Sequence, residues 1–300
     1  LDSIEELDFS QDTKSRKIDA DDDSAYEKQS SWGGFRGEGN SKAQTRDIPL
    51  KWSDKRNLLW RRNISGYGQS TPVIFGERVF TTSTSGKKSE ELIVRCHKVS
   101  NGKLLWEKNF PSPNEIERSQ YVSQAAPSPV VDSSKVYVFF ESGKMIALSH
   151  LGEVKWERNL TEEYGPLEGN HGVGSSLFQN KESIGLLIDH AGPSYLLRIS
   201  KSNGINEWKI DRPERVSWST PTLSESSDGK QILYVSSNGV LEAYDFSTGN
   251  KLWSYDGVEG NTVASPTLSD DLVIIGSSKD GHCLALKEET SIQMRKGWFG

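Results

Sequence analysis

The sequence predicts an all-β fold, a β-propeller built from four-stranded blades. Three observations predict it: a Gly-to-Trp spacing that recurs four times, Ser/Thr-Pro pairs that open most of the repeats, and short β-type runs joined by Gly-containing turns. A repeat of about 45 residues is typical of folds that stack one small sheet on the next, because a single small sheet cannot bury both of its faces.

The Gly-to-Trp spacing marks the outer strand of each repeat. In four segments a glycine is followed four positions later by a tryptophan: Gly102 and Trp106, Gly152 and Trp156, Gly204 and Trp208, Gly249 and Trp253. Trp60 lies 46 residues before Trp106 and extends the series towards the N-terminus. A large indole ring on an outer strand suits packing between neighbouring blades, so we interpret these residues as structural.

The innermost strand of each repeat is predicted at a Ser/Thr-Pro pair. The pairs are Thr71-Pro72, Ser128-Pro129, Thr220-Pro221 and Ser265-Pro266, and the third unit has Ser175-Ser176 instead. On an inner edge strand, the missing N–H of proline costs no ladder hydrogen bond. Two further runs follow in each unit, such as residues 232–236 and 240–245, and the Asn-Gly between them favours a hairpin because it adopts positive φ. These runs are strands a, b, c and d of one blade.

The chain is predicted to have three parts. Residues 1–31 hold ten acidic and four basic side chains and few apolar ones, which predicts a disordered acidic tail. Residues 32–64 form a lead-in segment with a strand at Trp60 that would complete a blade, and residues 65–300 form the repeats. Five inner strands are recognisable but the outer strand of the fifth unit is not, so we expect at least five blades in a chain that stops short of a complete ring.

Composition excludes several function classes. The net charge of −6 comes from the tail, so the repeats are neutral and lack the basic footprint of a nucleic-acid-binding protein. No apolar run reaches about 18 residues, so no transmembrane helix is expected. Two cysteines cannot staple a disulfide scaffold, and Cys96 and Cys283 are interpreted as buried structural thiols.

The outer half of the fourth unit resembles the pyrroloquinoline-quinone (PQQ)-like propeller repeat. Residues 243–253 read Ala-Tyr-Asp-Phe-Ser-Thr-Gly-Asn-Lys-Leu-Trp, with the alanine, aspartate, Thr-Gly and tryptophan of that repeat. The run Trp32-Gly33-Gly34-Phe35-Arg36-Gly37 also resembles the lead-in of secreted bacterial members. The resemblance covers roughly residues 32–290 and implies a WD40-like propeller of the quinoprotein alcohol dehydrogenase-like superfamily.

Two branches of this family imply different functions. One oxidises alcohols with PQQ and calcium, and the other is non-catalytic and includes the outer-membrane-assembly lipoproteins. The sequence has neither the adjacent cysteines of the enzymes nor a calcium loop of alternating Asp and Asn. We therefore expect no catalytic, cofactor-binding or metal-binding residues, and a periplasmic or secreted scaffold, its signal segment not part of this chain, that binds other proteins. A PQQ- and calcium-dependent dehydrogenase and a carbohydrate-binding propeller are the alternatives.

The loops that join strand d of one blade to strand a of the next are predicted to gather at one face, around the mouth of the channel. They concentrate aromatic and amide side chains, the composition of recognition surfaces. The candidate binding residues are Tyr67, Gln69, Tyr121, Gln124, His171, Arg215, Trp218 and Asn261. The same residues also suit a structural role, in which they plug the channel and satisfy backbone groups.

Overall fold

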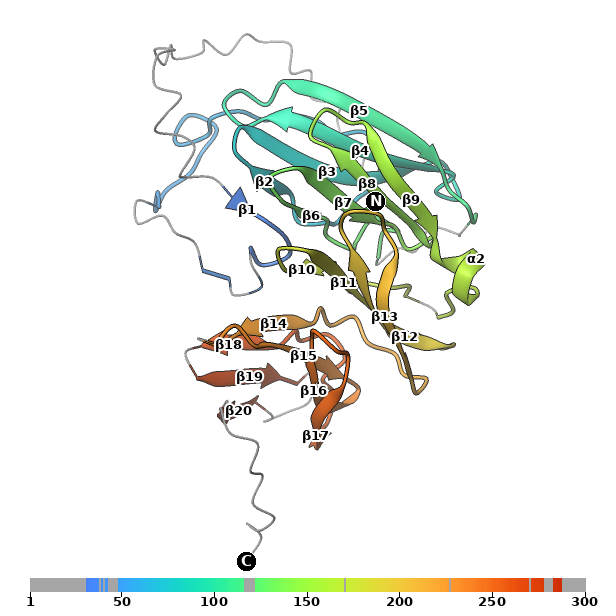
Figure 1. The fold of residues 1–300 in the computed structure, drawn as a ribbon. Helices are drawn as coiled ribbons and strands as arrows, with labels where there is room; N and C mark the ends of the chain where they lie inside the picture. The colour runs from blue at the N-terminus through green and yellow to red at the C-terminus, as the bar shows by residue number, and fades with distance from the viewer. Residues whose placement is uncertain are drawn as a thin grey trace, which may run out of the picture.

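The computed structural model describes residues 31–37, 39, 41–42, 48–115, 122–169, 171–226, 228–269, 271–277 and 283–287. These residues form five antiparallel sheets and one short helix (Figure 1). We number the sheets as blades one to five in chain order. The all-β propeller-type prediction is confirmed.

Each blade is a simple up-and-down meander, so strands that follow one another in sequence are also neighbours in the sheet. Blade one contains β1 (Ser31–Trp32), β2 (Val73–Phe75), β3 (Arg78–Ser85), β4 (Glu91–Lys98) and β5 (Leu104–Pro111). Blade two contains β6 (Val130–Val131), β7 (Lys135–Phe139), β8 (Lys144–Ser149) and β9 (Val154–Asn159), and α2 (Leu160–Tyr164) follows it.

The other three blades repeat this order. Blade three contains β10 (Phe178–Gln179), β11 (Ser183–Ile188), β12 (Ser194–Ser200) and β13 (Asn206–Arg212). Blade four contains β14 (Thr222–Glu225), β15 (Gln231–Ser237), β16 (Gly239–Asp245) and β17 (Lys251–Val258). Blade five has three described strands, β18 (Thr267–Ser269), β19 (Leu272–Gly276) and β20 (Cys283–Lys287).

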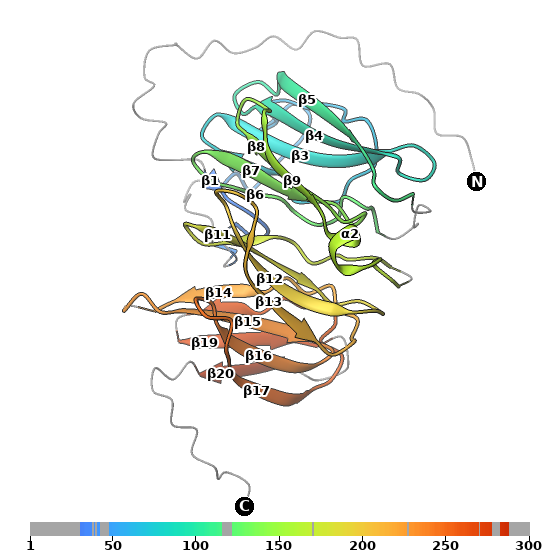
Figure 2. The ribbon, with the colours of Figure 1, turned by 45° about the vertical axis from the view of Figure 1, so that its right-hand side comes forward.

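The blades follow one another in an arc, from blade one at the top of Figures 1 and 2 to blade five at the bottom. The inner strands touch along the concave side, where β2 contacts β6, β10 contacts β14, and β14 contacts β18. Four apolar clusters fill the spaces between consecutive blades. In β7, Tyr137 and Phe139 pack towards blade three while Val136 and Val138 pack towards blade one. Alternate side chains point to opposite faces of a strand, so both faces of β7 are buried.

The turn between strands c and d has the same geometry in blades one to four. The c–d register shifts in every one of these blades, at residues 96–97, 147–148, 198–199 and 243–244. Each shift adjoins the residue that pairs with the tryptophan of strand d, as Ala243 pairs with Trp253. The turn glycine takes a positive φ, +76° at Gly204 and Gly249, which other residues adopt only with strain.

Part of the lead-in runs along the concave side and contacts every blade; we call residues 31–37 and 39 the inner segment. Its strand β1 pairs with β2 of blade one, and its Gly33 carbonyl accepts from Val131 N (2.9 Å) and Gln179 Nε2 (3.2 Å) of blades two and three. Gly39 lies beside Thr222 of blade four. Arg36 donates to the Pro266 carbonyl (3.2 Å) and to Thr267 Oγ1 (2.7 Å) of blade five.

Several details differ from the sequence predictions. The prolines precede strand a, because β2 begins one residue after Pro72. In blade one, strand a is not the inner edge, since β1 pairs with it. The segment around Trp60 forms no strand, and no described strand lies beside it to complete a ladder. Cys96 is buried, but Cys283 is exposed, because no outer strand covers β20 among the described residues.

Candidate functional site

The d–a loops and the b–c hairpins lie at the same end of the blades and form one face, which we call the loop face. An isolated bridge joins Tyr67 of the first such loop to Thr84 at the end of β3. At blade two, Leu160 N donates to the Gly143 carbonyl (2.9 Å), so the end of β9 meets the β7–β8 hairpin. The helix α2 marks this end of the molecule at the right of Figure 2.

The structure separates the predicted loop-face residues into two groups. Gln69 and His171 are exposed, and Tyr67, Arg215 and Trp218 are half-buried. Gln124 and Asn261 are buried instead, and Tyr121 lies outside the described residues. Only the first group is open to a partner.

Asn261 holds the b–c hairpin of its own blade rather than facing solvent. Its Nδ2 donates to Ser236 Oγ and to the Val240 carbonyl, both at 2.9 Å, and its Oδ1 accepts from Gly239 N at 2.6 Å. All three partners lie in β15 and β16. This amide therefore satisfies the polar groups of a tight turn, as a buried side-chain amide must.

Trp218 and His171 form an aromatic pair from two different loops. Their ring centroids lie 6.0 Å apart, and Trp218 Nε1 donates to the Gly172 carbonyl at 2.9 Å. The Trp218 backbone N–H donates to the Thr262 carbonyl at 2.7 Å, which ties this loop to the next one. Gln69 makes a similar link, because its Oε1 accepts from Ser123 N at 2.8 Å. The loops thus support one another around the face.

Glu141 is a loop-face residue that the sequence did not reveal. It lies in the β7–β8 hairpin, is 9% exposed, and its backbone N–H donates to the Gln124 carbonyl at 2.9 Å. Burial raises the pKa of its carboxyl to about 7. One glutamate in a short hairpin carries no sequence signal of this kind, since its burial depends on a loop from the next blade.

A buried ionic cluster lies close to the same face, at the ends of blades three and four. Arg212 donates from Nε to Asp189 Oδ1 (2.8 Å) and from Nη1 to Glu242 Oε2 (2.6 Å), and all three side chains are nearly inaccessible. Burial acts to lower the pKa of Arg212, but the facing Asp189 and Glu242 charges leave that pKa raised. The pKa of Glu242, which burial alone would raise, is lowered by Arg212. Ser237 Oγ also donates to Asp189, so the cluster is internally satisfied.

The tryptophans of blades one to three lie between blades, each on the turn glycine of the next blade, and Trp60 of the lead-in lies on the turn glycine of blade one. A Cβ added to the glycine would meet the indole ring at 2.6 to 3.2 Å. The pairs are Trp60 on Gly102, Trp106 on Gly152, Trp156 on Gly204 and Trp208 on Gly249. The next turn, on which Trp253 would rest, is outside the described residues.

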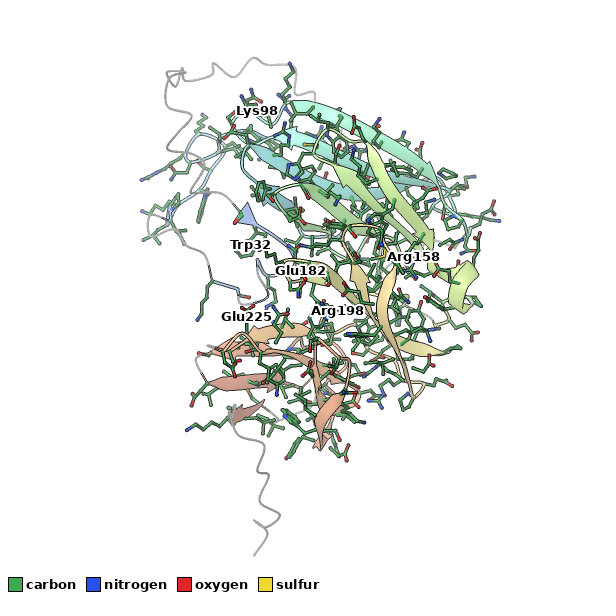
Figure 3. The ribbon with its side chains drawn as sticks, viewed as in Figure 1. Trp32, Lys98, Arg158, Glu182, Arg198 and Glu225 are labelled. Carbon is green, nitrogen blue, oxygen red and sulfur yellow. The ribbon has the colours of Figure 1, made fainter. Side chains whose placement is uncertain are left out.

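Hydrogen bonds fix each indole to the turn that it covers. Trp106 Nε1 donates to the His150 carbonyl at 2.8 Å, and Trp208 Nε1 donates to the Phe246 carbonyl at 3.0 Å. Arginines add to three of these junctions: Arg158 donates to the Gly204 carbonyl and Arg198 to the Phe246 carbonyl, both at 2.9 Å (Figure 3), and Arg62 donates to the Gly102 carbonyl at 3.2 Å. These contacts place the tryptophans in the frame of the propeller, away from the loop face.

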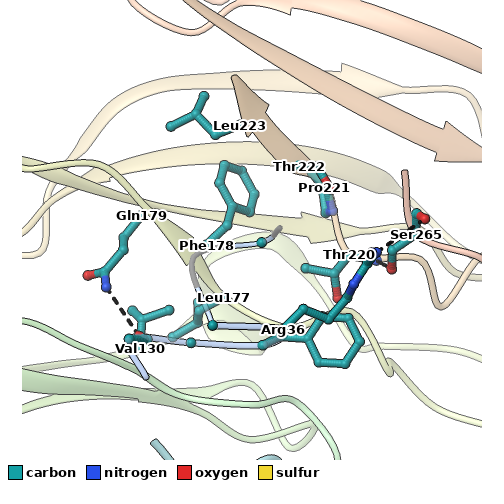
Figure 4. Close-up of a pocket in the computed structure, with 15 residues that line it drawn as sticks. Arg36, Val130, Leu177, Phe178, Gln179, Thr220, Pro221, Thr222, Leu223 and Ser265 are labelled. Atoms are coloured by element: carbon teal, nitrogen blue, oxygen red, sulfur yellow. Dashed lines mark hydrogen bonds between the residues drawn. The ribbon is translucent and has the colours of Figure 1, made fainter. Parts of the chain in front are cut away.

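The cavity at the inner strands does not fit a quinone with calcium. It has a volume of about 80 Å³ and is lined by the inner segment and by residues in or just before strand a of blades two to five (Figure 4). Sites for organic ligands usually enclose about 300 Å³ or more. Calcium takes six or more oxygen ligands, carboxylates among them, and no Asp or Glu lines this cavity. Over the described ranges, no three His, Cys, Asp or Glu side chains are grouped as metal ligands.

Among the described residues, the structure has no helix with the length and apolar character needed to span a bilayer.

The family model and a curated relative agree on one family. The family model described as outer membrane protein assembly factor BamB matches residues 50–255 and 190–291. An Aliivibrio fischeri protein of that name is 28% identical over 100 residues, which cover 33% of this chain and 24% of that protein. This chain therefore matches about a quarter of its curated relative's length.

Solved structures show the same fold. BamB from Moraxella catarrhalis aligns with a TM-score of 0.53 at 16% identity, over 76% of this chain and 63% of that one. Quinohemoprotein alcohol dehydrogenase from Comamonas testosteroni aligns with a TM-score of 0.53 at 13% identity, over 74% of this chain and 41% of that one. The repeats, the stacked blades and the family match together show that the chain belongs to the PQQ-like repeat family of the outer membrane protein assembly factor BamB.

Proposed function

We propose that this chain is a non-enzymatic scaffold that binds other proteins through its loop face, in the periplasm, during the assembly of outer membrane proteins. The observation that carries the proposal is the aromatic pair of exposed His171 and half-buried Trp218, on loops that the neighbouring blades hold in place. Aromatic side chains on rigid supports are typical of protein interfaces. The name of the matching family, an outer membrane protein assembly factor, supports the setting.

The inner cavity supports a scaffold over the dehydrogenase alternative. A quinone needs a cavity several times larger than about 80 Å³, and the inner segment fills that side of the blades. Arg36 holds the segment there through the Pro266 carbonyl and Thr267. We therefore propose that no PQQ or calcium acts in this protein, and that its partners are polypeptides rather than nucleic acid.

Site-specific photo-crosslinking tests the proposal. A photoreactive residue is placed at His171 or Tyr67 on the loop face, and at Lys155 on the outer strand β9 as the control. We expect the two loop-face positions to crosslink a component of the outer membrane assembly machinery in cells, and Lys155 to give no such product. Crosslinking of equal strength from Lys155, or none from the loop face, would contradict the proposal.

A titration with PQQ and calcium tests the enzyme alternative separately. The nine tryptophans make the fluorescence of the chain sensitive to a bound quinone. We expect no saturable, calcium-dependent quenching. Saturation at micromolar quinone would replace the scaffold with a dehydrogenase-like protein.

A further inference from the structure

Glu141 is the one acidic side chain of the β7–β8 hairpin, and it is held in the loop face by its backbone. Its N–H donates to the Gln124 carbonyl at 2.9 Å, and the turn closes with Gly143 N donating to the Phe140 carbonyl at 2.9 Å. The residue is 9% exposed, so it is largely buried but keeps a small accessible surface.

No side chain in the described part of the structure pairs with the Glu141 carboxylate. Asp189 and Glu242 are buried to a similar degree, and both are paired with Arg212. Only burial acts on the pKa of Glu141, which is raised to about 7, so no neighbouring charge compensates it. An isolated carboxylate of this kind is costly to keep ionised, and such groups concentrate at functional sites.

The fold leaves room for this carboxylate at a glycine of the next loop. A Cβ on Gly172 would lie 1.8 Å from Glu141 Oε1, so any side chain there would displace the carboxylate. The carbonyl of the same glycine accepts from Trp218 Nε1 at 2.9 Å. Glu141 thus lies next to Gly172, the residue whose carbonyl anchors Trp218 of the Trp218–His171 pair.

The d–a loops around Glu141 carry mainly acidic side chains, and a negative charge favours the binding of a cation. Glu115 is paired with Lys88 of the β3–β4 turn, whereas no cationic side chain of the described residues forms an ion pair with Glu168 or Glu214. Arg215 lies 3.9 Å from Glu242 and is directed to the buried cluster. The described d–a loops carry Glu115, Glu168, Glu214 and Glu259 as their acidic side chains and Arg215 as their basic one. An acidic face attracts a basic partner and repels an acidic one.

We propose that Glu141 binds the guanidinium or ammonium group of an arginine or lysine side chain presented by a partner polypeptide, whose stem packs on Trp218. An ionised carboxylate only accepts hydrogen bonds, so a cation with several N–H donors is the group that compensates it best. The indole offers apolar and cation–π contact to the same side chain. This inference deepens the proposed protein-binding function and rests on it.

Short peptides test this site directly. The probes are acetyl-Ala-Arg-Ala-amide, its lysine analogue, and its citrulline analogue, which keeps the shape of arginine without the charge. Binding is followed by fluorine NMR of protein labelled with fluorotryptophan, and Trp218→Phe identifies the resonance of Trp218 by its loss. We expect the arginine and lysine peptides to shift that resonance saturably, and the citrulline peptide to bind at least about tenfold more weakly, because its hydrogen bonds are not charge-assisted.

Variants separate Glu141 from the general charge of the face. Glu141→Gln keeps the shape of the side chain and is expected to weaken the arginine peptide at least about tenfold. Gly172→Ala, which pushes the carboxylate aside, is expected to do the same. Glu168→Gln removes an exposed charge from the loop face and is the matched control, expected to change binding less than about twofold. Far-UV circular dichroism verifies that each variant is folded.

Two results would overturn the inference: equal binding of the arginine and citrulline peptides, or equal loss in Glu141→Gln and Glu168→Gln. The crosslinking experiment keeps this outcome distinct from the proposed function. If the peptides fail while His171 still crosslinks a partner, the Glu141 site is wrong and the scaffold remains. If His171 crosslinks nothing, the scaffold itself is wrong, whatever the peptides do.

Discussion

Replacing Gly204 with alanine tests the inter-blade packing of the tryptophans. The new Cβ would lie 2.7 Å from Trp156 Cδ2, closer than such atoms come in proteins, and φ at this position is +76°. The ring cannot retreat freely, because Trp156 Nε1 donates to the Lys201 carbonyl at 3.2 Å. The substitution therefore combines backbone strain with overpacking between blades two and three.

Gly229 is a matched control for the backbone strain. Its φ is +81°, but no atom lies within 4 Å of the position that a Cβ would take. An alanine in this left-handed region costs about 1–2 kcal/mol of folding free energy in both variants. Replacing glycine with alanine also lowers the conformational entropy of the unfolded chain, and this effect is the same in both variants. Overpacking adds about 1–3 kcal/mol at Gly204 alone. We expect Gly204→Ala to be less stable than Gly229→Ala by that amount.

Urea denaturation followed by far-UV circular dichroism measures the difference. With a slope of about 3 kcal/mol per molar urea, Gly204→Ala should unfold about 0.3–1 M earlier than Gly229→Ala. In a Trp156→Leu background the ring is gone, so the two alanine variants should lose equal free energy of unfolding. Equal midpoints in the wild-type background, or an undiminished difference in Trp156→Leu, would refute the packing explanation.

Three further predictions concern buried polar groups. Arg212→Met leaves Asp189 and Glu242 without their cation and should cost about 3–5 kcal/mol in the free energy of unfolding; a loss below about 1 kcal/mol in urea would contradict the buried pairing. Asn261→Ala should cost about 1–3 kcal/mol, since it strands the polar groups of the β15–β16 hairpin, and hydrogen exchange of that hairpin should accelerate. The raised pKa of Glu141 means that the folded protein binds a proton more tightly than the unfolded chain, so its stability contribution falls as pH rises from about 4.5 to about 7. Glu141→Gln should therefore be more stable than the wild type by about 3 kcal/mol at pH 8 and equal to it near pH 4, and a difference that does not depend on pH would contradict the burial of this carboxyl.

The repeat pattern predicted most of the fold because its signals are local. A turn glycine and a tryptophan of strand d recur at one offset, and the hairpins between strands b and c carry their own turn residues. The offset does not show which glycine each ring covers. Trp156 follows Gly152 in the sequence but lies on Gly204 of the next blade. That contact depends on how blades stack, which no single repeat encodes.

The candidate site was predicted less well, because exposure depends on neighbouring loops. Asn261 and His171 both stand in polar d–a loops, yet Asn261 is buried in a hairpin and His171 is exposed. The amino-acid composition identifies the loops as a candidate binding face, but it does not show which of their side chains are exposed. Glu141 is buried through Gly172, a residue 31 positions away on another loop. No pattern within the hairpin itself indicates that contact.

The inner segment imposes an order on folding. Arg36 is synthesised about 230 residues before its acceptors, the Pro266 carbonyl and Thr267 Oγ1. At about 5–20 residues per second, that interval lasts roughly 10–50 s. Blades one to four can stack sequentially during this time, since each contacts mainly its predecessor. The segment completes its contacts only when blade five exists, so these contacts of longest range form after blades one to four have been synthesised.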